Sequence, residues 1–167
     1  MIRPAEPRTP EGEKATEVIL SAFRVNGLLL AAGDVISAEH GLTSARWQVL
    51  GAIVYAHQPL TVPQIARRMG LTRQSVHTTV NRLVTDRMVE LLSNADHRRS
   101  PLVSLTERGR ARYQAVDQKQ AAWVNQLVAG LSRSDLQTTA RVLGELCTRL
   151  ETDPSQPHIQ EGDDHEP

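Results

Sequence analysis

The chain has 167 residues, and its 19 basic side chains (Lys and Arg) balance 19 acidic ones, so the formal net charge is zero. Apolar residues make up 40% of the chain but aromatic residues only 3%, so a core must be mostly aliphatic, which suits one or two small helical domains. The single Cys excludes a disulfide framework. The start is polar and Pro-rich, and no apolar run approaches the ~20 residues of a membrane span. We therefore expect a cytoplasmic protein without membrane contact.

The first predicted helix runs from Glu13 to about His40, after an N-terminal tail (residues 1–12) that we expect to be disordered. Its apolar residues recur at spacings of three and four positions: Val18, Ile19, Ala22, Phe23, Leu29, Leu30 and Ile36. Gly27 and Gly33 interrupt this helix at a cost of about 1 kcal/mol each relative to Ala. A close contact with another helix would explain them.

A second helix is predicted from the N-cap Thr43 to about His57, and two short helices follow it. Thr61 with Gln64 three positions later forms a capping box for the first short helix. Gly70 comes directly after that helix, where a left-handed residue is preferred. So short a turn cannot place the two helices antiparallel. They must cross steeply, as in a helix-turn-helix.

The second short helix has one apolar face and one hydrogen-bonding face. Thr72 is its expected N-cap, and its buried residues repeat at helical spacing: Val76, Val80, Leu83 and Val84. The opposite face carries side chains suited to base edges and phosphates: Arg73, Gln74, Ser75, His77, Thr78, Asn81 and Arg82. The alternative is an ordinary solvent-exposed helix face. Such a face usually mixes acidic with basic residues, whereas this one has no acid before Asp86. The pattern predicts a DNA recognition helix.

A β-hairpin with a basic tip is predicted after the recognition helix. Its strands, Met88 to Ser93 and Ser100 to Leu105, are joined by a loop that contains Arg98 and Arg99. Pro101 favours an edge position in its strand. A two-stranded ribbon with two arginines at its tip is typical of a wing, whose cations can enter a narrow A·T-rich minor groove.

Two more helices are predicted, one capped by Thr106 and one opened by Ser132 with Asp135 three positions later. The last helix has a narrow apolar seam, which suggests packing against one or two other helices: Leu136, Leu143, Leu146 and Leu150. The first and last helices have no obvious place in a compact DNA-reading domain. We therefore expect them to bury their apolar faces against a second copy of the chain.

The charges are segregated although their total is zero. Between Thr61 and Arg110, nine Arg stand against four acids, a local balance of +5. From Glu151 to Pro167 there are six acids and no Lys or Arg, a balance of −6. Phosphate binding responds to the local field rather than to the total. The acidic tail, residues 151–167, is expected to be disordered, and it either keeps the chain soluble or competes with DNA for the basic region.

No enzyme motif is found. The sequence has no Gly-rich phosphate loop, no Gly-x-Ser-x-Gly and no His-Glu-x-x-His. Its six His are scattered without zinc-like spacing, and Cys147 is best explained as a small buried hydrophobic residue. We expect no catalytic residue, no metal and no cofactor.

The chain resembles the MarR family of bacterial transcriptional regulators. The resemblance runs from LTSARWQVL (Leu42 to Leu50), through both short helices, to DHRRSPLVSLTERG (Asp96 to Gly109), and it covers roughly residues 13–150. An Arg-rich wing that closes on Leu-Thr-x-x-Gly is its most specific part. It implies an all-α fold with a small β-hairpin wing, in which helices from both termini build a dimer above two winged helix-turn-helix domains.

One departure from the family pattern lies in the wing. The pattern has an Asp nine positions before the Thr that ends the wing, and an Arg seven positions before it. Counting back from Thr106, Arg99 fits, whereas His97 occupies the Asp position and Asp96 precedes it. Either Asp96 or His97 is then expected to brace the wing, and bracing by His97 would make wing order depend on pH near neutrality. Alternatively, Arg98 and Arg99 merely pair with Asp96.

The resemblance also implies a cleft between the dimer helices and the winged domain, where small aromatic or phenolic effectors bind and reduce DNA affinity. By their order in the sequence, Phe23, Asn26, Arg46 and Trp47 are placed to line it. Trp47 is equally well explained as a core residue.

The sequence thus predicts a non-enzymatic regulator, most simply a repressor, that binds double-stranded DNA as a homodimer on a pseudo-palindromic operator. Residues 13–58 and 106–150 would form the dimerisation region, and residues 59–105 the DNA-binding domain. The residues expected to touch DNA are Arg73, Gln74, Ser75, His77, Thr78, Arg82, Arg98 and Arg99. The alternative is a winged-helix adaptor that binds proteins without specific DNA binding; such an adaptor has no reason to keep this face free of acids.

Overall fold

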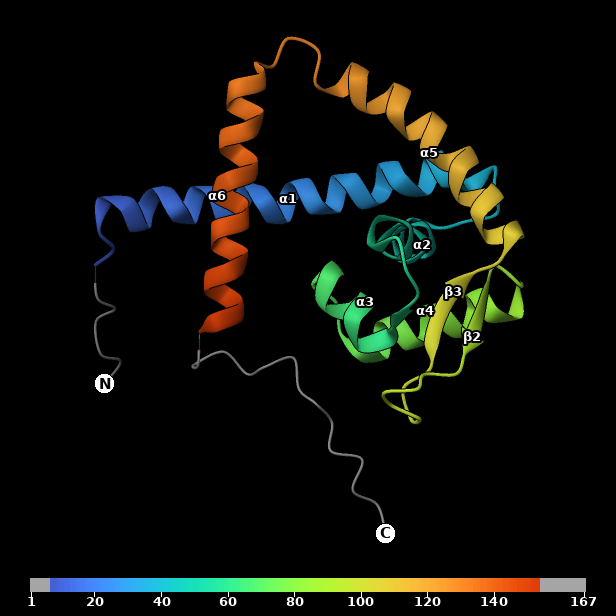
Figure 1. Ribbon diagram of the computed structural model, residues 1–167. Helices are drawn as coiled ribbons and strands as arrows, with labels where there is room; N and C mark the ends of the chain where they lie inside the picture. Colours follow the sequence, from blue (N-terminus) through green and yellow to red (C-terminus); the bar gives the residue numbers. More distant parts are fainter. Residues whose placement is uncertain (1–6, 154–167) are drawn as a thin grey trace, which may run out of the picture. The chain divides into compact units, whose positions relative to one another are not determined.

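The computed structural model describes residues 7–153, so the expectations for residues 1–6 and 154–167 lie outside it. In chain order the elements are α1 (Pro10–Ala38), α2 (Ser44–Ala56), β1 (Leu60–Thr61), α3 (Val62–Met69), α4 (Arg73–Thr85), β2 (Val89–Leu92), β3 (Leu102–Leu105), α5 (Glu107–Leu127) and α6 (Arg133–Thr152). The predicted class, all-α with a small β-hairpin wing, is confirmed (Figure 1). The chain forms two compact units, Met1–Gln120 and Ala121–Pro167.

α2 lies at the centre of the first unit, with α1 on one side and α3 and α4 on the other (Figure 1). The core between these elements is aliphatic, as the composition predicted. Its fully buried large side chains are Val49, Leu50, Leu60, Ile65, Val76, Val80, Leu83, Val103 and Val116. Removing such apolar surface from water stabilises the fold by roughly 25 cal/mol per Å². The core covers one face of α4 and leaves the opposite face exposed.

Close polar contacts join the end of α1 to the start of α2. A Cβ at Gly33 would lie 2.6 Å from Ser44 Oγ, so the glycine permits the close helix contact expected there, whereas nothing lies within 4 Å of such an atom at Gly27. The Oδ1 atom of Asp34 accepts a hydrogen bond of 2.6 Å from the backbone N–H of Ser44. This N–H is one that the first turn of α2 leaves without a partner. The buried Ser37 hydroxyl bonds the carbonyl of Gly33 at 2.7 Å.

The sheet has three antiparallel strands in the order β1-β3-β2. In β1, Leu60 pairs with Val103, and in the hairpin Val89 pairs with Leu105. The sequence predicted the hairpin but not β1. β3 is the central strand, and Pro101 stands at its N-terminal edge, where the sequence placed it. Pro101 directly precedes β3, so the sheet does not require the N–H that proline lacks.

Thr106 connects the wing to α5 and to the end of α4. Its hydroxyl donates to the carbonyl of Arg87 at 2.8 Å and lies 3.1 Å from that of Met88. The same oxygen accepts the N–H of Gly109 at 3.1 Å and so caps α5, as predicted. One side chain therefore fixes where β2 begins and where α5 begins.

The second unit contains the end of α5 and all of α6. Ser132 caps α6 by accepting the N–H of Asp135 at 3.0 Å, as the sequence predicted. α6 has no buried residue among those described. Three leucines of its apolar seam are exposed, Leu136 (39%), Leu143 (39%) and Leu150 (59%), and the fourth, Leu146, is half-buried.

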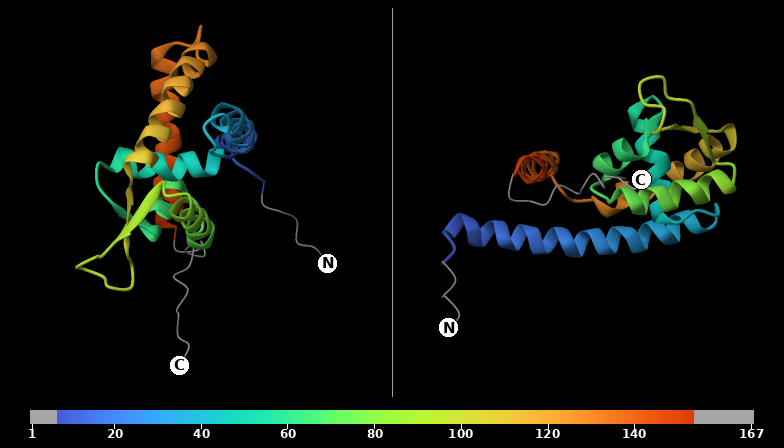
Figure 2. Two further views of the ribbon diagram at one scale, coloured as in Figure 1. Left: turned by 90° about the vertical axis from the view of Figure 1, so that its right-hand side faces the viewer. Right: turned by 90° about the horizontal axis from the view of Figure 1, so that it is seen from below.

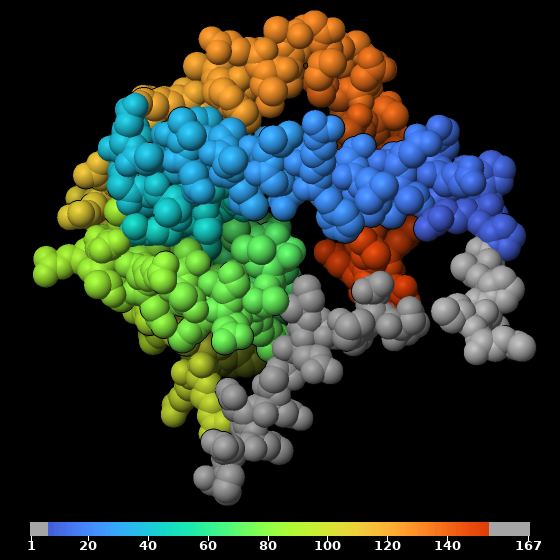
Figure 3. All heavy atoms as spheres, turned by 180° about the vertical axis from the view of Figure 1, so that it is seen from behind, coloured from blue at the N-terminus to red at the C-terminus, as the bar shows by residue number. Residues whose placement is uncertain are grey.

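α1 also exposes most of its apolar side chains. Phe23 is 70% exposed and Val35 77%, and the face of α1 turned toward the viewer in Figure 3 is not covered by the rest of the first unit. Among the described residues, α1 is the one helix long and apolar enough to cross a membrane by length and composition alone. The expectation that no segment meets this criterion is wrong, because only Arg24 and Asp34 bring charge between Val18 and the helix end. A helix that buries its apolar side chains against a second copy of the chain has the same apolar composition.

Candidate nucleic-acid interface

The helix-turn-helix is built from three local signals that the sequence predicted. The Thr61 hydroxyl and the Gln64 side chain form the reciprocal capping box of α3. Gly70 ends α3 in the left-handed conformation, with φ of 61°, which costs glycine little. Thr72 then caps α4 by accepting the N–H of Ser75 at 3.1 Å. The turn therefore sets the direction in which α4 leaves α3.

The two faces of α4 differ as predicted. Val76, Val80 and Leu83 are at most 1% exposed. On the other side Arg73 is half-buried, and the remaining predicted DNA contacts of this helix are exposed: Gln74, Ser75, His77, Thr78 and Arg82. The Asn81 amide nitrogen lies 3.3 Å from His77 Nδ1, one helical turn away. The structure thus brings these side chains together on one solvent-facing surface.

The wing projects from the first unit and carries Arg98 and Arg99 in its exposed loop (Figure 2). Its loop is closed by Asn94, which the sequence analysis did not single out. The Asn94 amide donates to the Ser100 carbonyl at 2.8 Å, and its side-chain oxygen accepts the N–H of Asp96 at 3.1 Å. Asn is common in turns because its side chain forms such hydrogen bonds with nearby backbone groups. This turn preference is the sequence signal that could have identified Asn94.

Neither predicted bracing residue contacts the wing arginine in the described part of the chain. Asp96 and His97 are both exposed, and their side chains form no hydrogen bond or ion pair with Arg99 in residues 7–153. Bracing of the wing by Asp96 or His97 stays a prediction.

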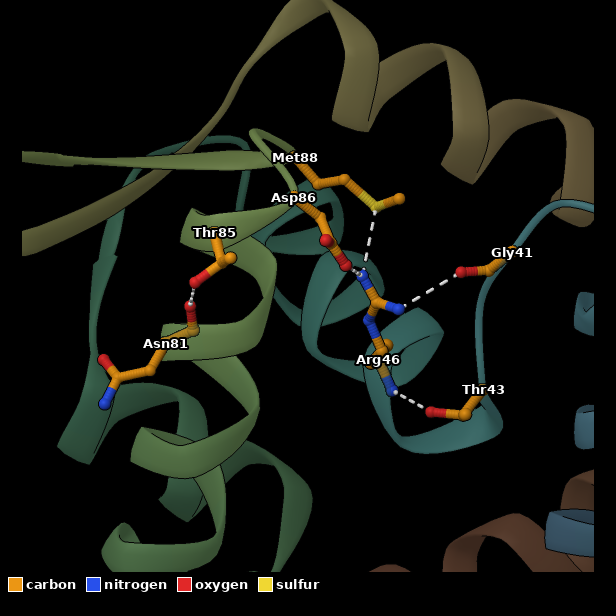
Figure 4. A network of polar contacts seen from close by, with 7 residues as sticks. All are labelled: Gly41, Thr43, Arg46, Asn81, Thr85, Asp86 and Met88. Carbon is orange, nitrogen blue, oxygen red and sulfur yellow. Dashed lines mark hydrogen bonds and ion pairs between the residues drawn. The ribbon is translucent and has the colours of Figure 1, made fainter.

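Arg46 joins three segments next to the end of α4 (Figure 4). Its Nη2 forms an ion pair with the Oδ2 of Asp86, the C-cap residue of α4, and lies 3.8 Å from the sulfur of Met88. Its Nη1 donates to the carbonyl of Gly41 at 3.2 Å. The sequence placed Arg46 in an effector cleft, but here its side chain is engaged with these three residues.

A pocket of about 490 Å³ opens between α2, α3 and α5 in the first unit. Its walls are partly aromatic, with polar groups among them: Trp47, Gln48, Gly51, Ala52, Tyr55, Arg68, Met69, Tyr113, Asp117 and Gln120. Of the four residues expected to line an effector cleft, Trp47 does so here. Phe23 and Asn26 lie exposed on α1 and are not among the lining residues. The α5 side of the pocket was not predicted from the sequence.

Tyr113 is a buried residue of this pocket that carries a polar group. It is 5% exposed, and its hydroxyl donates to Asp117 Oδ1 at 3.2 Å. Burial, which disfavours the charged phenolate, raises the pKa of Tyr113 well above its usual value, and hydrogen bonding with Tyr55 and the charge of Asp117 act in the same direction. The phenol therefore stays protonated and remains a hydrogen-bond donor at neutral pH.

The described residues contain no group of three or more His, Cys, Asp or Glu side chains that could hold a metal ion. Cys147 is exposed on α6, so the expectation that it is buried is wrong for the single chain.

Sequence comparison places these features in a family. A model of the MarR family matches residues 40–100, from the turn after α1 to the wing loop. An uncharacterized protein of Mycobacterium bovis is 38% identical over 141 residues, which cover 84% of this chain and 97% of that protein. The chain belongs to the MarR family. The family assignment made from the recognition helix and the wing motif is thus confirmed, and with it the winged-helix fold of a transcriptional regulator.

Solved MarR-family structures share this fold at low sequence identity. MOSR of Mycobacterium tuberculosis, solved in complex with DNA, has a TM-score of 0.65 and 21% identity, covering 78% of this chain and 95% of that one. MarR of Staphylococcus aureus, solved with salicylate and kanamycin, has a TM-score of 0.67 and 20% identity, covering 80% and 90%. The DNA and the small molecules belong to those proteins, and the likeness concerns the fold.

Proposed function

We propose that this MarR-family protein is a homodimeric transcriptional regulator in the cytoplasm, which binds a pseudo-palindromic operator and releases it when a small aromatic molecule binds. The observation that carries the proposal is the exposed face of α4, where hydrogen-bonding and cationic side chains gather without an acid before Asp86. A protein-binding adaptor gains nothing from keeping a face of this kind. Residues 59–105 would form the DNA-binding domain.

The exposed residues of α4 and the wing suit different parts of the duplex. Gln74 and Thr78 can hydrogen-bond base edges in the major groove, whereas Arg82 is suited to phosphates. Arg98 and Arg99 are suited to a flanking minor groove. In a dimer with a two-fold axis, half-site centres would lie about one turn (~10 bp) apart.

The apolar faces of the terminal helices support dimerisation. α1 exposes Phe23, Leu28 and Val35 by more than half, and the seam of α6 is exposed as well. Soluble monomers rarely leave large contiguous apolar surfaces in water. We therefore assign residues 13–58 and 106–150 to the dimerisation region, whose partner is a second copy of the chain.

The pocket beside α3 supports a role in ligand response. Its volume of about 490 Å³ suits a small molecule. Trp47, Tyr55 and Tyr113 offer aromatic surface, while Arg68 and Asp117 offer polar contacts. Arg68 and Met69 belong to α3, which the Gly70 turn joins directly to α4. A ligand in this pocket would contact α3, and the turn after α3 sets the direction of α4.

Repression is the simplest mode of action. A dimer that occupies an operator over a promoter excludes the polymerase, whereas the same dimer bound upstream of a promoter can assist it. The position of the operator, and not the fold, would then decide the direction of regulation.

Selection of bound sequences from random DNA tests the proposal. The expected result is a pseudo-palindromic motif with half-sites about 10 bp apart, flanked by A·T-rich base pairs. Sedimentation at the same protein concentration should give a dimer. Selected pools without a common motif, together with a protein partner captured by the same face, would support the adaptor instead.

A further inference from the structure

We propose that Arg46 is a positioning residue for DNA recognition: through Asp86 it holds the C-terminal end of α4 against the turn between α1 and α2. It touches no DNA itself. The inference rests on the proposed function, because it concerns how α4 is presented to an operator.

The contacts of Arg46 require its planar guanidinium group. The side chain is 17% exposed, and its two terminal nitrogens bind different partners, Asp86 on one side and the Gly41 carbonyl on the other. Its Nε is buried without a hydrogen-bond partner in the described chain. The position of the side chain therefore depends on the contacts of its two terminal nitrogens. Lysine has a single terminal nitrogen and cannot bind both partners with the forked geometry of a guanidinium group.

Asp86 is placed where the chain turns from α4 toward the wing. Its N–H bonds the carbonyls of Arg82 and Val84 and so ends the helix. Arg87 follows in the left-handed conformation, with φ of 54°, which is unfavourable for a residue with a Cβ. The Met88 N–H then bonds the Leu83 carbonyl at 2.8 Å. The ion pair with Arg46 therefore fixes the junction from which both α4 and β2 depart.

The other end of the contact lies in the turn that follows α1. Gly41 has a φ of 67°, and its carbonyl is the acceptor for Arg46. Glu39 in the same turn forms an ion pair with Lys119 of α5. Arg46 thus connects a turn anchored to α1 and α5 with the end of the recognition helix, 40 residues further along the chain. If α1 builds the dimer, this contact helps to set the orientation of each α4 relative to the dimer axis.

A charge role and a positioning role predict opposite effects of one substitution. Asp86 is 44% exposed, and a carboxylate at a helix C-terminus adds to the negative end of the helix dipole. If Arg46 only neutralises this charge, Asp86→Asn should tighten binding to DNA. If Arg46 positions α4 through Asp86, the same change should weaken binding to the operator although it removes a negative charge.

The experiment compares Arg46→Met, Asp86→Asn and the double variant on the selected operator and on random-sequence DNA. We expect each single change to weaken operator binding by about tenfold, and the double variant to bind no more weakly than the weaker single one. Asp86→Asn should not weaken binding to random DNA, because it removes a negative charge. Arg112→Met, which removes an exposed arginine of α5, is the control for the loss of one positive charge. Operator affinity of Asp86→Asn equal to or above that of the wild type would overturn the proposal.

Amide hydrogen exchange of the DNA-free protein gives an independent readout. The N–H groups of Asp86 and Met88 should exchange faster in both single variants than in Arg112→Met, and unchanged exchange would also overturn the proposal. Because this measurement needs no operator, it separates the two failures. If the wild type selects no DNA motif, the proposed function fails, while faster exchange would still establish the restraint at the end of α4.

Discussion

A side chain at position 109 would collide with the backbone carbonyl of Met88. Gly109 lies in the first turn of α5, and a Cβ built on it would overlap that carbonyl group. The carbonyl is also held by the N–H of Thr106 at 3.1 Å, so it cannot move aside freely. The Leu-Thr-x-x-Gly motif therefore has two physical causes: its Thr caps α5, and its Gly permits the close approach of Met88, the residue before β2, to α5.

Replacement of Gly109 by Ala should be strongly destabilising. We expect the free energy of unfolding to fall by at least about 2 kcal/mol, because backbone must shift to relieve the contact. Urea denaturation at fixed protein concentration measures this change. Gly27→Ala is the matched control, since nothing lies within 4 Å of a Cβ there; it should stabilise α1 by up to about 1 kcal/mol. A Gly109→Ala variant as stable as the wild type would contradict the close approach.

DNA affinity should depend steeply on salt. The logarithm of the association constant is expected to fall linearly with the logarithm of salt concentration, by ~0.9 per phosphate neutralised, for about 6–10 contacts in a dimer. Fluorescence anisotropy titrations at several salt concentrations give the slope. A slope near zero would remove phosphate binding and favour the adaptor.

Gln74→Ala should relax sequence preference, whereas Arg82→Ala should weaken binding to all sequences about equally. The first change removes a base contact worth ~1–3 kcal/mol at particular base pairs, and the second removes a phosphate contact. Thr78→Ala should resemble Gln74→Ala with a smaller effect. Repeated selection with each variant distinguishes these outcomes, and an unchanged motif for Gln74→Ala would show that α4 is docked differently.

Arg99→Ala should remove most of the minor-groove contribution of the wing, and Arg98→Ala less of it. Both residues are exposed in the wing loop. Because a cation in a narrow groove responds to groove width, the loss should be greatest on operators with A·T-rich flanks. Affinities measured on A·T-rich and G·C-rich flanks test this. Equal losses on both would mean that Arg99 only contacts phosphates.

Stability should decline in strongly alkaline solution because of Tyr113. Its raised pKa means that the folded chain keeps a proton that the unfolded chain releases. The resulting stabilisation is complete below the unfolded phenol pKa of about 10 and is lost as pH rises above it. Tyr113→Phe should show a smaller decline in urea denaturation.

The same group can be observed directly in Tyr55→Phe. The chain has two tyrosines, so Tyr113 is then the only phenol. Its near-ultraviolet phenolate absorbance should develop only above about pH 10. Ionisation at or below that value in the folded variant would contradict the burial of Tyr113.

Features that depend on neighbouring residues could be predicted from the sequence. The caps Thr61, Thr72 and Ser132 act over three positions, and the apolar spacing of α4 is a property of one helix. These signals also led to the family. β1 could not be predicted in this way, because Leu60 and Thr61 become a strand only by pairing with residues of β3.

The contacts of long side chains could not be predicted from the sequence either. The order of the chain placed Arg46 beside Trp47 in a cleft, but its guanidinium group pairs with Asp86, which is 40 residues away in the sequence. The α5 side of the pocket was missed because Tyr113 and Asp117 follow ordinary helical spacing, and only folding brings them opposite Trp47.

Asn94 orders the wing loop in the DNA-free protein. With both ends of its amide engaged, the loop that carries Arg98 and Arg99 has already lost much of its conformational freedom. Ordering a loop on association costs free energy, and a preorganised loop has less of that cost left. More of the attraction between the arginines and a narrow groove then remains as affinity.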